Sequence, residues 1–332
     1  MKKISAFCAI IILAAALLFA GGSGEASGSK ETQTSDGHST VIIRFPTAGA
    51  SGALYSVGAA ITNMWNINVP FVKASSQASA GGIDNLNQIA DGESQVSIAI
   101  SSNCWQSYNG TDVFEGSANP KLRVIAGLYL NPNQVVVTNR SGITTLAEVK
   151  GKHFAVAASG SSVEGECKKH FTAAGLNYPD DIRAEYISFS DSAELLANGQ
   201  IDGAWIMSGT PAPAVSQALS SGCRLLSIDE NTIDALKAEY PWYVTYMIPA
   251  GTYPNQKEDV RTTAIKMVLF CSADLDEETV YMLTKTLWEN IGELGESQSN
   301  LRSLTPQQAV LDIAGLPLHE GARQYYSEIG VL

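Results

Sequence analysis

Positive charge is scarce in this chain. Of its 332 residues, 21 are Lys or Arg against 33 Asp or Glu, which gives a formal net charge of −12. An acidic surface repels phosphate backbones and offers no basic stripe to anionic lipids. We therefore expect no nucleic-acid partner. A small anion in a cleft is still compatible with this charge, because local backbone dipoles can outweigh distant surface charges.

Cysteine and histidine are also rare, with five and four residues. A CxxC pair is typical of zinc sites, and the cysteines beyond the N-terminal segment form no such pair. They are Cys104, Cys167, Cys223 and Cys271. We expect isolated buried thiols, since the histidines are too few to complete a metal site. No metal and no cofactor are expected.

Motifs for common nucleotide and hydrolase chemistry are missing. There is no GxxxxGK[ST] run, and no GxGxxG opens a strand–helix unit, so neither a phosphate loop nor a dinucleotide fold is indicated. A GxSxG nucleophile elbow is absent as well. The histidines are scattered over His38, His153, His170 and His319. The chain is predicted not to be an enzyme; the alternative is an exported hydrolase acting through Ser161.

The N-terminus has the pattern of an export signal. Lys2 and Lys3 precede an apolar run over 4–20, and small residues follow at 20–22. We predict a signal peptide over 1–22 and a flexible Gly- and Ser-rich tether over 23–40. The protein would then be periplasmic. An uncleaved signal that tethers it to the membrane is the alternative.

From Val41 onward, β segments and helices alternate. Strands are expected at 41–45, 69–74, 96–100, 154–157, 185–189 and 203–207, with helical periods between them. This alternation is typical of α/β lobes with largely parallel sheets. The predicted organisation is lobe I at 41–134, lobe II at 135–245, and a return to lobe I with C-terminal helices over 246–332. The two crossings are expected at 135–137 and 243–248, with a ligand cleft between the lobes.

Small polar loops recur between a predicted strand and the helix that follows it. They are Gly49-Ala50-Ser51-Gly52, Gly81-Gly82, Ser159-Gly160-Ser161-Ser162 and Ser208-Gly209-Thr210. Each presents backbone amides at the positive end of a helix dipole, which can hold a carboxylate without arginine. A single loop of this kind is usually only a turn. Four of them beside one predicted cleft indicate binding, and Ser102 and Asn103 follow the strand 96–100 at the same edge.

Aromatic side chains divide into two groups. Core packing is expected for Trp65, Trp205 and Trp288. For Tyr55 and Tyr243, packing and ligand contact are equally open, because their neighbours place them at the mouth of the cleft. A phenol there can stack on a ligand's carbon chain and donate a hydrogen bond.

Longer strings carry a family resemblance over 41–332. They are TAGASGALYSVG (47–58), AGGIDNL (80–86), NGQIDGAWIMSGTPAPAV (198–215), YPWYVTYMIPAGTYPNQ (240–256) and LPLHEGARQYYSEIGVL (316–332). In these strings the chain resembles the TAXI type of solute-binding protein, the extracytoplasmic subunit of a tripartite ATP-independent periplasmic (TRAP) transporter. The resemblance implies an α/β, two-lobed, periplasmic-binding-protein-like (type II) fold with two crossing strands and a C-terminal helical segment.

The resemblance also implies a function. The two lobes would close on a small carboxylate, such as an amino acid or a dicarboxylate, and dock on TRAP-type membrane permease subunits. The family's motifs match Gly49, Ser51, Gly52, Tyr55, Gly81, Gly82, Asn85, Ser208, Gly209, Thr210 and Pro211. Our candidate set adds Ser102, Asn103, Ser159, Ser161, Ser162 and Tyr243.

Two departures from the family pattern affect the choice of solute. The family often has an Asp where this chain has Ser102-Asn103, and a GSGT-like loop at 160–163, so glutamate is not assumed. A periplasmic sensory ligand-binding module stays open as a different function.

Overall fold

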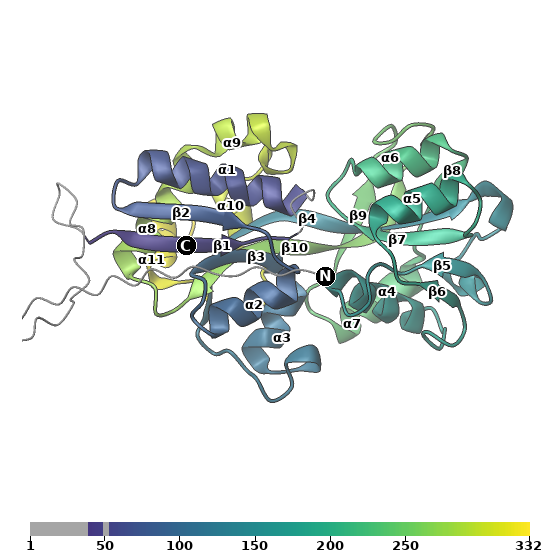
Figure 1. Ribbon diagram of the computed structural model, residues 1–332, viewed down its shortest axis with the longest axis horizontal. Coiled ribbons are helices and arrows are strands. Elements are labelled where there is room, and N and C mark those ends of the chain that lie inside the picture. Colours follow the sequence, from purple (N-terminus) through teal and green to yellow (C-terminus); the bar gives the residue numbers. More distant parts are fainter. Residues whose placement is uncertain (1–38, 49–52) are drawn as a thin grey trace, which may run out of the picture.

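The computed structural model describes residues 39–48 and 53–332, so the predicted signal peptide and most of the predicted tether lie outside the described residues. Two α/β lobes are joined by two long strands (Figure 1). The expected fold class, an α/β two-lobed type II architecture, is confirmed. Among the described residues, no helix combines the length and apolar character needed to cross a bilayer.

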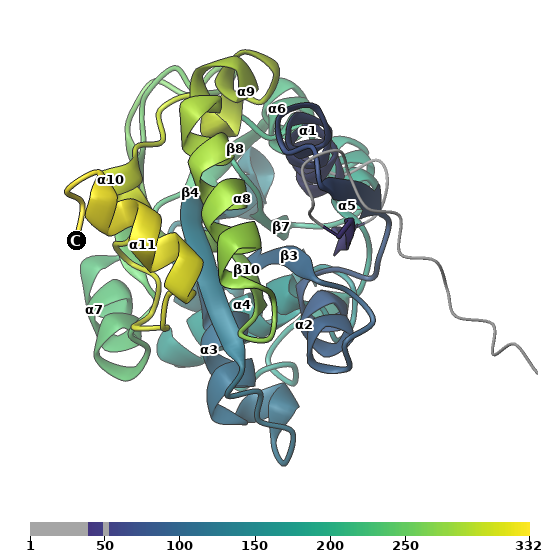
Figure 2. The ribbon, with the colours of Figure 1, turned by 90° about the vertical axis from the view of Figure 1, so that its left-hand side faces the viewer.

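The first lobe is built from both ends of the described chain. Its N-terminal part contains β1 (Val41–Pro46), α1 (Ala53–Asn68), β2 (Val72–Gln77), α2 (Gly82–Ala90), β3 (Val96–Ile100) and α3 (Ser101–Asn109). Its C-terminal part contains α8 (Glu277–Glu289), α9 (Ile291–Ser297), α10 (Pro306–Ala309) and α11 (Glu320–Glu328). Helices α8 and α11 pack side by side and against β4, as Figure 2 shows. The C-terminal helical segment therefore packs on the first lobe, as expected.

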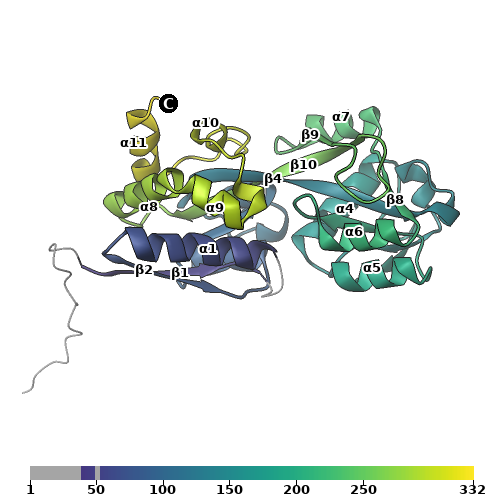
Figure 3. The same cartoon turned by 90° about the horizontal axis from the view of Figure 1, so that it is seen from above.

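The second lobe is formed by the middle of the chain. Its elements are β5 (His153–Ala155), α4 (Ser162–Ala173), β6 (Arg183–Glu185), α5 (Phe189–Ala197), β7 (Gly203–Met207), α6 (Pro213–Ser220), β8 (Cys223–Leu226), α7 (Glu230–Glu239) and β9 (Val244–Ile248). Helices α5 and α6 cover one face of its sheet, and α4 and α7 lie on the other side (Figures 1 and 3).

The connection between the lobes is an antiparallel strand pair, β4 (Leu122–Thr138) and β10 (Val260–Ser272). In the first lobe β10 also pairs with β3, and in the second β4 pairs with β7. The resulting order is β3-β10-β4-β7-β5-β6. The sheet is therefore mixed, not largely parallel as expected, because the two strands that link the lobes run in opposite directions.

The return crossing lies later in the chain than expected. The segment expected to cross, 243–248, forms β9, which pairs with the start of β10 inside the second lobe. Ile248, Tyr253 and Val260 pack into one hydrophobic cluster of that lobe together with Val215. Lobe II therefore extends to the first half of β10, and the boundary expected at residue 245 is corrected.

One local expectation also changes. The strand expected at 185–189 is β6 over 183–185, because Ser188 caps α5 by accepting a hydrogen bond from the amide of Asp191. The strand expected at 96–100 is β3, and Ser101–Asn103 directly after it forms the start of α3.

The expected core residues are buried. Trp65 and Trp205 are fully enclosed, and Trp288 is buried with its indole N–H donating to the Tyr326 hydroxyl at 2.9 Å. The four cysteines of the described chain are buried and unpaired, which confirms isolated thiols.

Candidate ligand-binding site

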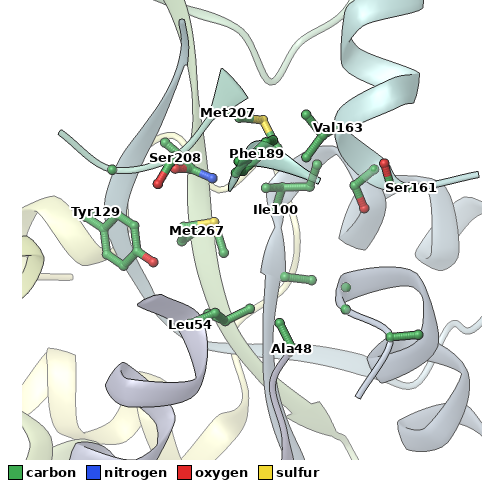
Figure 4. Close-up of a pocket in the computed structure, with 17 residues that line it drawn as sticks. Ala48, Leu54, Ile100, Tyr129, Ser161, Val163, Phe189, Met207, Ser208 and Met267 are labelled. Atoms are coloured by element: carbon green, nitrogen blue, oxygen red, sulfur yellow. The ribbon is translucent and has the colours of Figure 1, made fainter. Parts of the chain in front are cut away.

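A cavity of about 250 Å³ lies between the two lobes, on one side of the crossing strands (Figure 4). Residues of both lobes and of β4 and β10 line it. They are Ala48, Leu54, Ala80, Gly81, Gly82, Ala99, Ile100, Tyr129, Asn131, Ser161, Ser162, Val163, Phe189, Met207, Ser208, Gly209 and Met267.

Three of the four polar loops meet at this cavity. Gly81-Gly82 starts α2, Ser161-Ser162 starts α4, and Ser208-Gly209 follows β7. These loops are far apart in sequence but share the cavity, because each follows a strand that ends at the cleft. The fourth loop, with Gly49, Ser51 and Gly52, lies outside the described residues.

The backbone at α2 requires glycine. Gly81 has φ 104°, in the left-handed region that L side chains rarely adopt. A Cβ on Gly82 would come within 3.2 Å of the Ala99 Cβ, so α2 approaches β3 closely at this point. The close approach brings the first-turn amides of α2 to the cavity wall.

Helix N-termini are the strongest polar feature of the cavity. The first amides of α2 and α4 have no acceptor within their own helices and lie at the positive ends of the helix dipoles. Ser161 caps α4, its Oγ accepting a hydrogen bond from the Glu164 amide at 3.2 Å. The arrangement favours a negatively charged group near Gly82 and Ser162.

The remaining wall is mostly apolar. Phe189, Met207 and Val163 line it from the second lobe, and Ile100 and Met267 from the strands of the first (Figure 4). Methionine side chains adapt to irregular ligand shapes. The cavity therefore suits a solute with a hydrocarbon body.

Two polar residues of β4 were missed by the sequence reasoning. Burial raises the pKa of Tyr129 to about 12, so the phenol is neutral and can donate a hydrogen bond. The Oδ1 atom of Asn131 is buried and has no hydrogen-bond partner among the described residues. Side chains two positions apart on a strand lie on the same face, so the sequence could have indicated that Tyr129 and Asn131 share a face. Nothing in the sequence indicated that this face lines the cleft.

The cavity has almost no ionisable lining. Among the described residues, Tyr129 is the only titratable side chain in its wall. Within residues 39–48 and 53–332, no group of three His, Cys, Asp or Glu side chains is arranged to hold a metal ion.

Comparison with known families identifies the relatives of this chain. Residues 45–330 match the family described as NMT1-like, which is most of the chain. The chain belongs to the NMT1-like family.

Among solved structures similar to this NMT1-like protein, two with TM-scores above 0.5 share its fold. A Bordetella bronchiseptica RB50 protein is 14% identical with a TM-score of 0.52, covering 87% of this chain and 98% of that one. A Xanthomonas citri protein bound to ATP is 9% identical with a TM-score of 0.51, covering 87% and 99%. The alkanesulfonate-binding protein SsuA from Xanthomonas axonopodis pv. citri, bound to MOPS, is 18% identical with a TM-score of 0.48, covering 86% and 83%.

Several expected site residues of the NMT1-like protein lie away from the cavity. The Asn85 side chain is fully buried and donates to the carbonyls of Thr47 and Ile98, so it joins α2 to the strands. Ser159 and Pro211 are exposed, because the loops turn outward at these positions. None of these three residues lines the cavity between the lobes.

Three more expected residues have other surroundings. Tyr55 is half-buried on α1 and does not line the cavity, because the face of α1 that reaches the cavity carries Leu54. Thr210 lines a different cavity, beyond the crossing strands. Tyr243 is buried, and its hydroxyl donates to the Glu166 carboxylate.

Ser102 and Asn103 connect the lobes and do not line the cavity. The Ser162 hydroxyl of α4 donates to Asn103 Oδ1 at 2.5 Å, and the Ser102 hydroxyl donates to Glu166 Oε1 at 3.4 Å. Both bonds run between α3 of the first lobe and α4 of the second. They hold the lobes together beside the cavity.

A buried polar cluster follows on the inner side of α4. Glu166 is 1% exposed, and burial raises its pKa, opposed by the nearby Lys169 and by the hydrogen bond from Tyr243. One turn later, His170 Nδ1 lies 2.7 Å from the Glu166 carbonyl and Nε2 lies 2.7 Å from Thr263 Oγ1. Since Thr263 belongs to β10, this cluster fixes α4 to a crossing strand.

His170 should make stability depend on pH. Burial lowers its pKa from 6.5 to about 3, so the native state holds the neutral ring while the unfolded chain binds a proton. Its contribution to stability is complete above pH 6.5 and is lost as the pH falls toward 3, at up to about 1.4 kcal/mol per pH unit. Urea unfolding at pH 7 and pH 4.5 measures this loss.

The control for that measurement is His170→Gln, which keeps an amide near Thr263 but does not titrate. Burial also lowers the pKa of His319, so part of the acid sensitivity will stay in the variant. Equal acid sensitivity of wild type and His170→Gln would contradict the assignment to His170.

Proposed function

We propose that this NMT1-like protein is an extracytoplasmic solute-binding receptor that closes its two lobes on a small organic solute. The observation that carries the proposal is the cavity at the lobe boundary, lined by three strand-to-helix loops and both crossing strands. Clefts between lobes are the usual place for small ligands. The TAXI resemblance supports delivery of the solute to TRAP-type membrane permease subunits.

The solute class follows from the cavity wall. A carboxylate can accept hydrogen bonds from the first amides of α2 and α4, and an N–H group can donate to Asn131 Oδ1. The methionines and Phe189 then surround a hydrocarbon side chain. An amino acid with an apolar side chain fits these features. A dicarboxylate fits less well, because it offers no N–H group to Asn131 Oδ1.

The mechanism is hinge closure. A solute shifts the equilibrium between open and closed lobes only through contacts that it makes in the closed form. Here those contacts come from Gly82 on one side and Ser162 on the other, while the Ser162–Asn103 hydrogen bond links the lobes directly. The strands β4 and β10 are the segments about which the lobes would move.

A thermal-shift screen tests the proposal. Apolar amino acids are expected to raise the melting temperature more than dicarboxylates, since a ligand at 100 times its Kd stabilises by about 2.7 kcal/mol. Asn131→Leu should weaken binding of the best amino acid by about tenfold, because the N–H of the solute loses its acceptor. Calorimetry measures the affinities. No stabilisation by any amino acid or carboxylate would count against a receptor for this class.

No observation specifically favours the two alternative functions, an exported hydrolase and a sensory ligand-binding module. For a hydrolase, Ser161 would need a base, but its Oγ accepts the Glu164 amide and no described histidine lines the cavity. A sensory module would use the same closure and differ only in its partner.

A further inference from the structure

A second cavity of about 550 Å³ borders the crossing strands, and Tyr129 of β4 lines both cavities. Adjacent residues on a strand point to opposite faces. Asn131 and Met267 line the first cavity, whereas their neighbours Leu130 and Lys266 line the second. In Figure 3, α10 and β9 lie on the side of the crossing strands away from α1, and residues near both contribute to the second cavity.

Lys266 is the unusual residue of this cavity. The residue is 6% exposed, and it makes no hydrogen bond or ion pair with any described residue. Its stem packs closely on Gly127, where an added Cβ would lie 3.0 Å from the Lys266 Cε. A buried ammonium group is normally paired, because desolvation of an unpaired charge is costly.

The electrostatic environment agrees with an unpaired cation. Burial lowers the pKa of Lys266, and the negative charge of Asp312 opposes this effect without forming an ion pair. Asp312 also lines this cavity, but it is exposed, so water screens its charge. An anion inside the cavity would stabilise the ammonium more than Asp312 does.

The rest of the cavity offers hydrogen-bond donors from both lobes. Asn300 and Gln308 contribute amides from the first lobe, and Thr210 contributes a hydroxyl from the second. A carboxylate oxygen that meets Lys266 can therefore find further donors beside it.

We propose that this cavity is a second ligand site, which binds a small carboxylate through Lys266 on the side of the hinge strands away from the first cavity. The site takes its lining from both lobes and shares Tyr129 with the first cavity, but its cationic residue, Lys266, lines only the second.

Calorimetric titration with sodium acetate, succinate and phosphate, at constant ionic strength in chloride, tests the site. A carboxylate is expected to bind the wild-type protein and Val163→Trp, which fills the first cavity, with affinities within about twofold of each other. Lys266→Met keeps the stem and removes the charge. It should weaken that binding at least tenfold, which corresponds to about 1.4 kcal/mol.

Gln308→Glu provides a second variant that does not alter the buried lysine. It places a carboxylate of similar size at the cavity, and it should also reduce the affinity at least tenfold. The proposal is overturned if neither acetate nor succinate binds, if Lys266→Met and Gln308→Glu bind as the wild type does, or if phosphate alone responds. It is also overturned if Val163→Trp abolishes the response, because the carboxylate would then occupy the first cavity.

Discussion

Val163→Trp should reduce the affinity for the solute by at least about 100-fold. Val163 lies in the first turn of α4 and lines the cavity of about 250 Å³ (Figure 4). An indole at this position would occupy much of that space, and a ligand that overlaps it could not enter without displacing close-packed atoms. Calorimetry with the best solute from the thermal-shift screen measures the loss.

The matched control is Val163→Thr, which keeps the shape of the side chain and adds no volume. We expect its affinity to stay within a few-fold of wild type, and both variants to retain the wild-type circular dichroism spectrum. If Val163→Trp folded and bound the solute as tightly as the wild-type protein, the cavity would not be the binding site.

Trp205→Ala should lower the free energy of unfolding by about 3–5 kcal/mol, the range for large-to-small core substitutions. Trp205 is 0% exposed, and its ring packs 4.7 Å from His170 and 5.7 Å from Phe171, centroid to centroid. Its indole N–H donates to Asn133 Oδ1 at 3.0 Å. Truncation leaves both a cavity and an unpaired buried amide oxygen on a crossing strand. Urea unfolding followed by circular dichroism measures the change.

Trp205→Phe separates the two causes. It keeps most of the ring and removes the donor, so its cost should be about 1–3 kcal/mol, the range for an unsatisfied buried group. If Trp205→Ala lowered the free energy of unfolding by less than 1 kcal/mol, the packing account would be contradicted, because truncating a buried aromatic side chain costs more than this.

Some strands and loops of this protein could be predicted from local sequence patterns. The β7 strand was predicted with its observed ends, because its apolar residues stand between a helix-ending glycine and a polar loop. The loops at 81–82, 161–162 and 208–209 were recognised by their glycines and serines before helices. In each case the signal lies within a few residues, where backbone conformation and helix capping decide the structure.

Other features depended on partners far away in the chain. Asn85, Ser102 and Tyr243 have the residue types of a binding site, yet their side chains bond to Thr47, Glu166 and other protein atoms. No property of the residue itself separates these uses. A polar side chain in a loop satisfies whichever group the fold places beside it.

By itself, the sequence determined the α/β alternation, the two-lobed class and the positions of the polar loops, because hydrophobic period and glycine placement act locally. Only the tertiary structure decided that β10 returns to the first lobe, that Tyr129 and Asn131 of β4 face the cavity, and that Lys266 faces the other side. The physical reason is the pairing of β4 with β10: residues more than 100 positions apart acquire a common face only when the two strands come together.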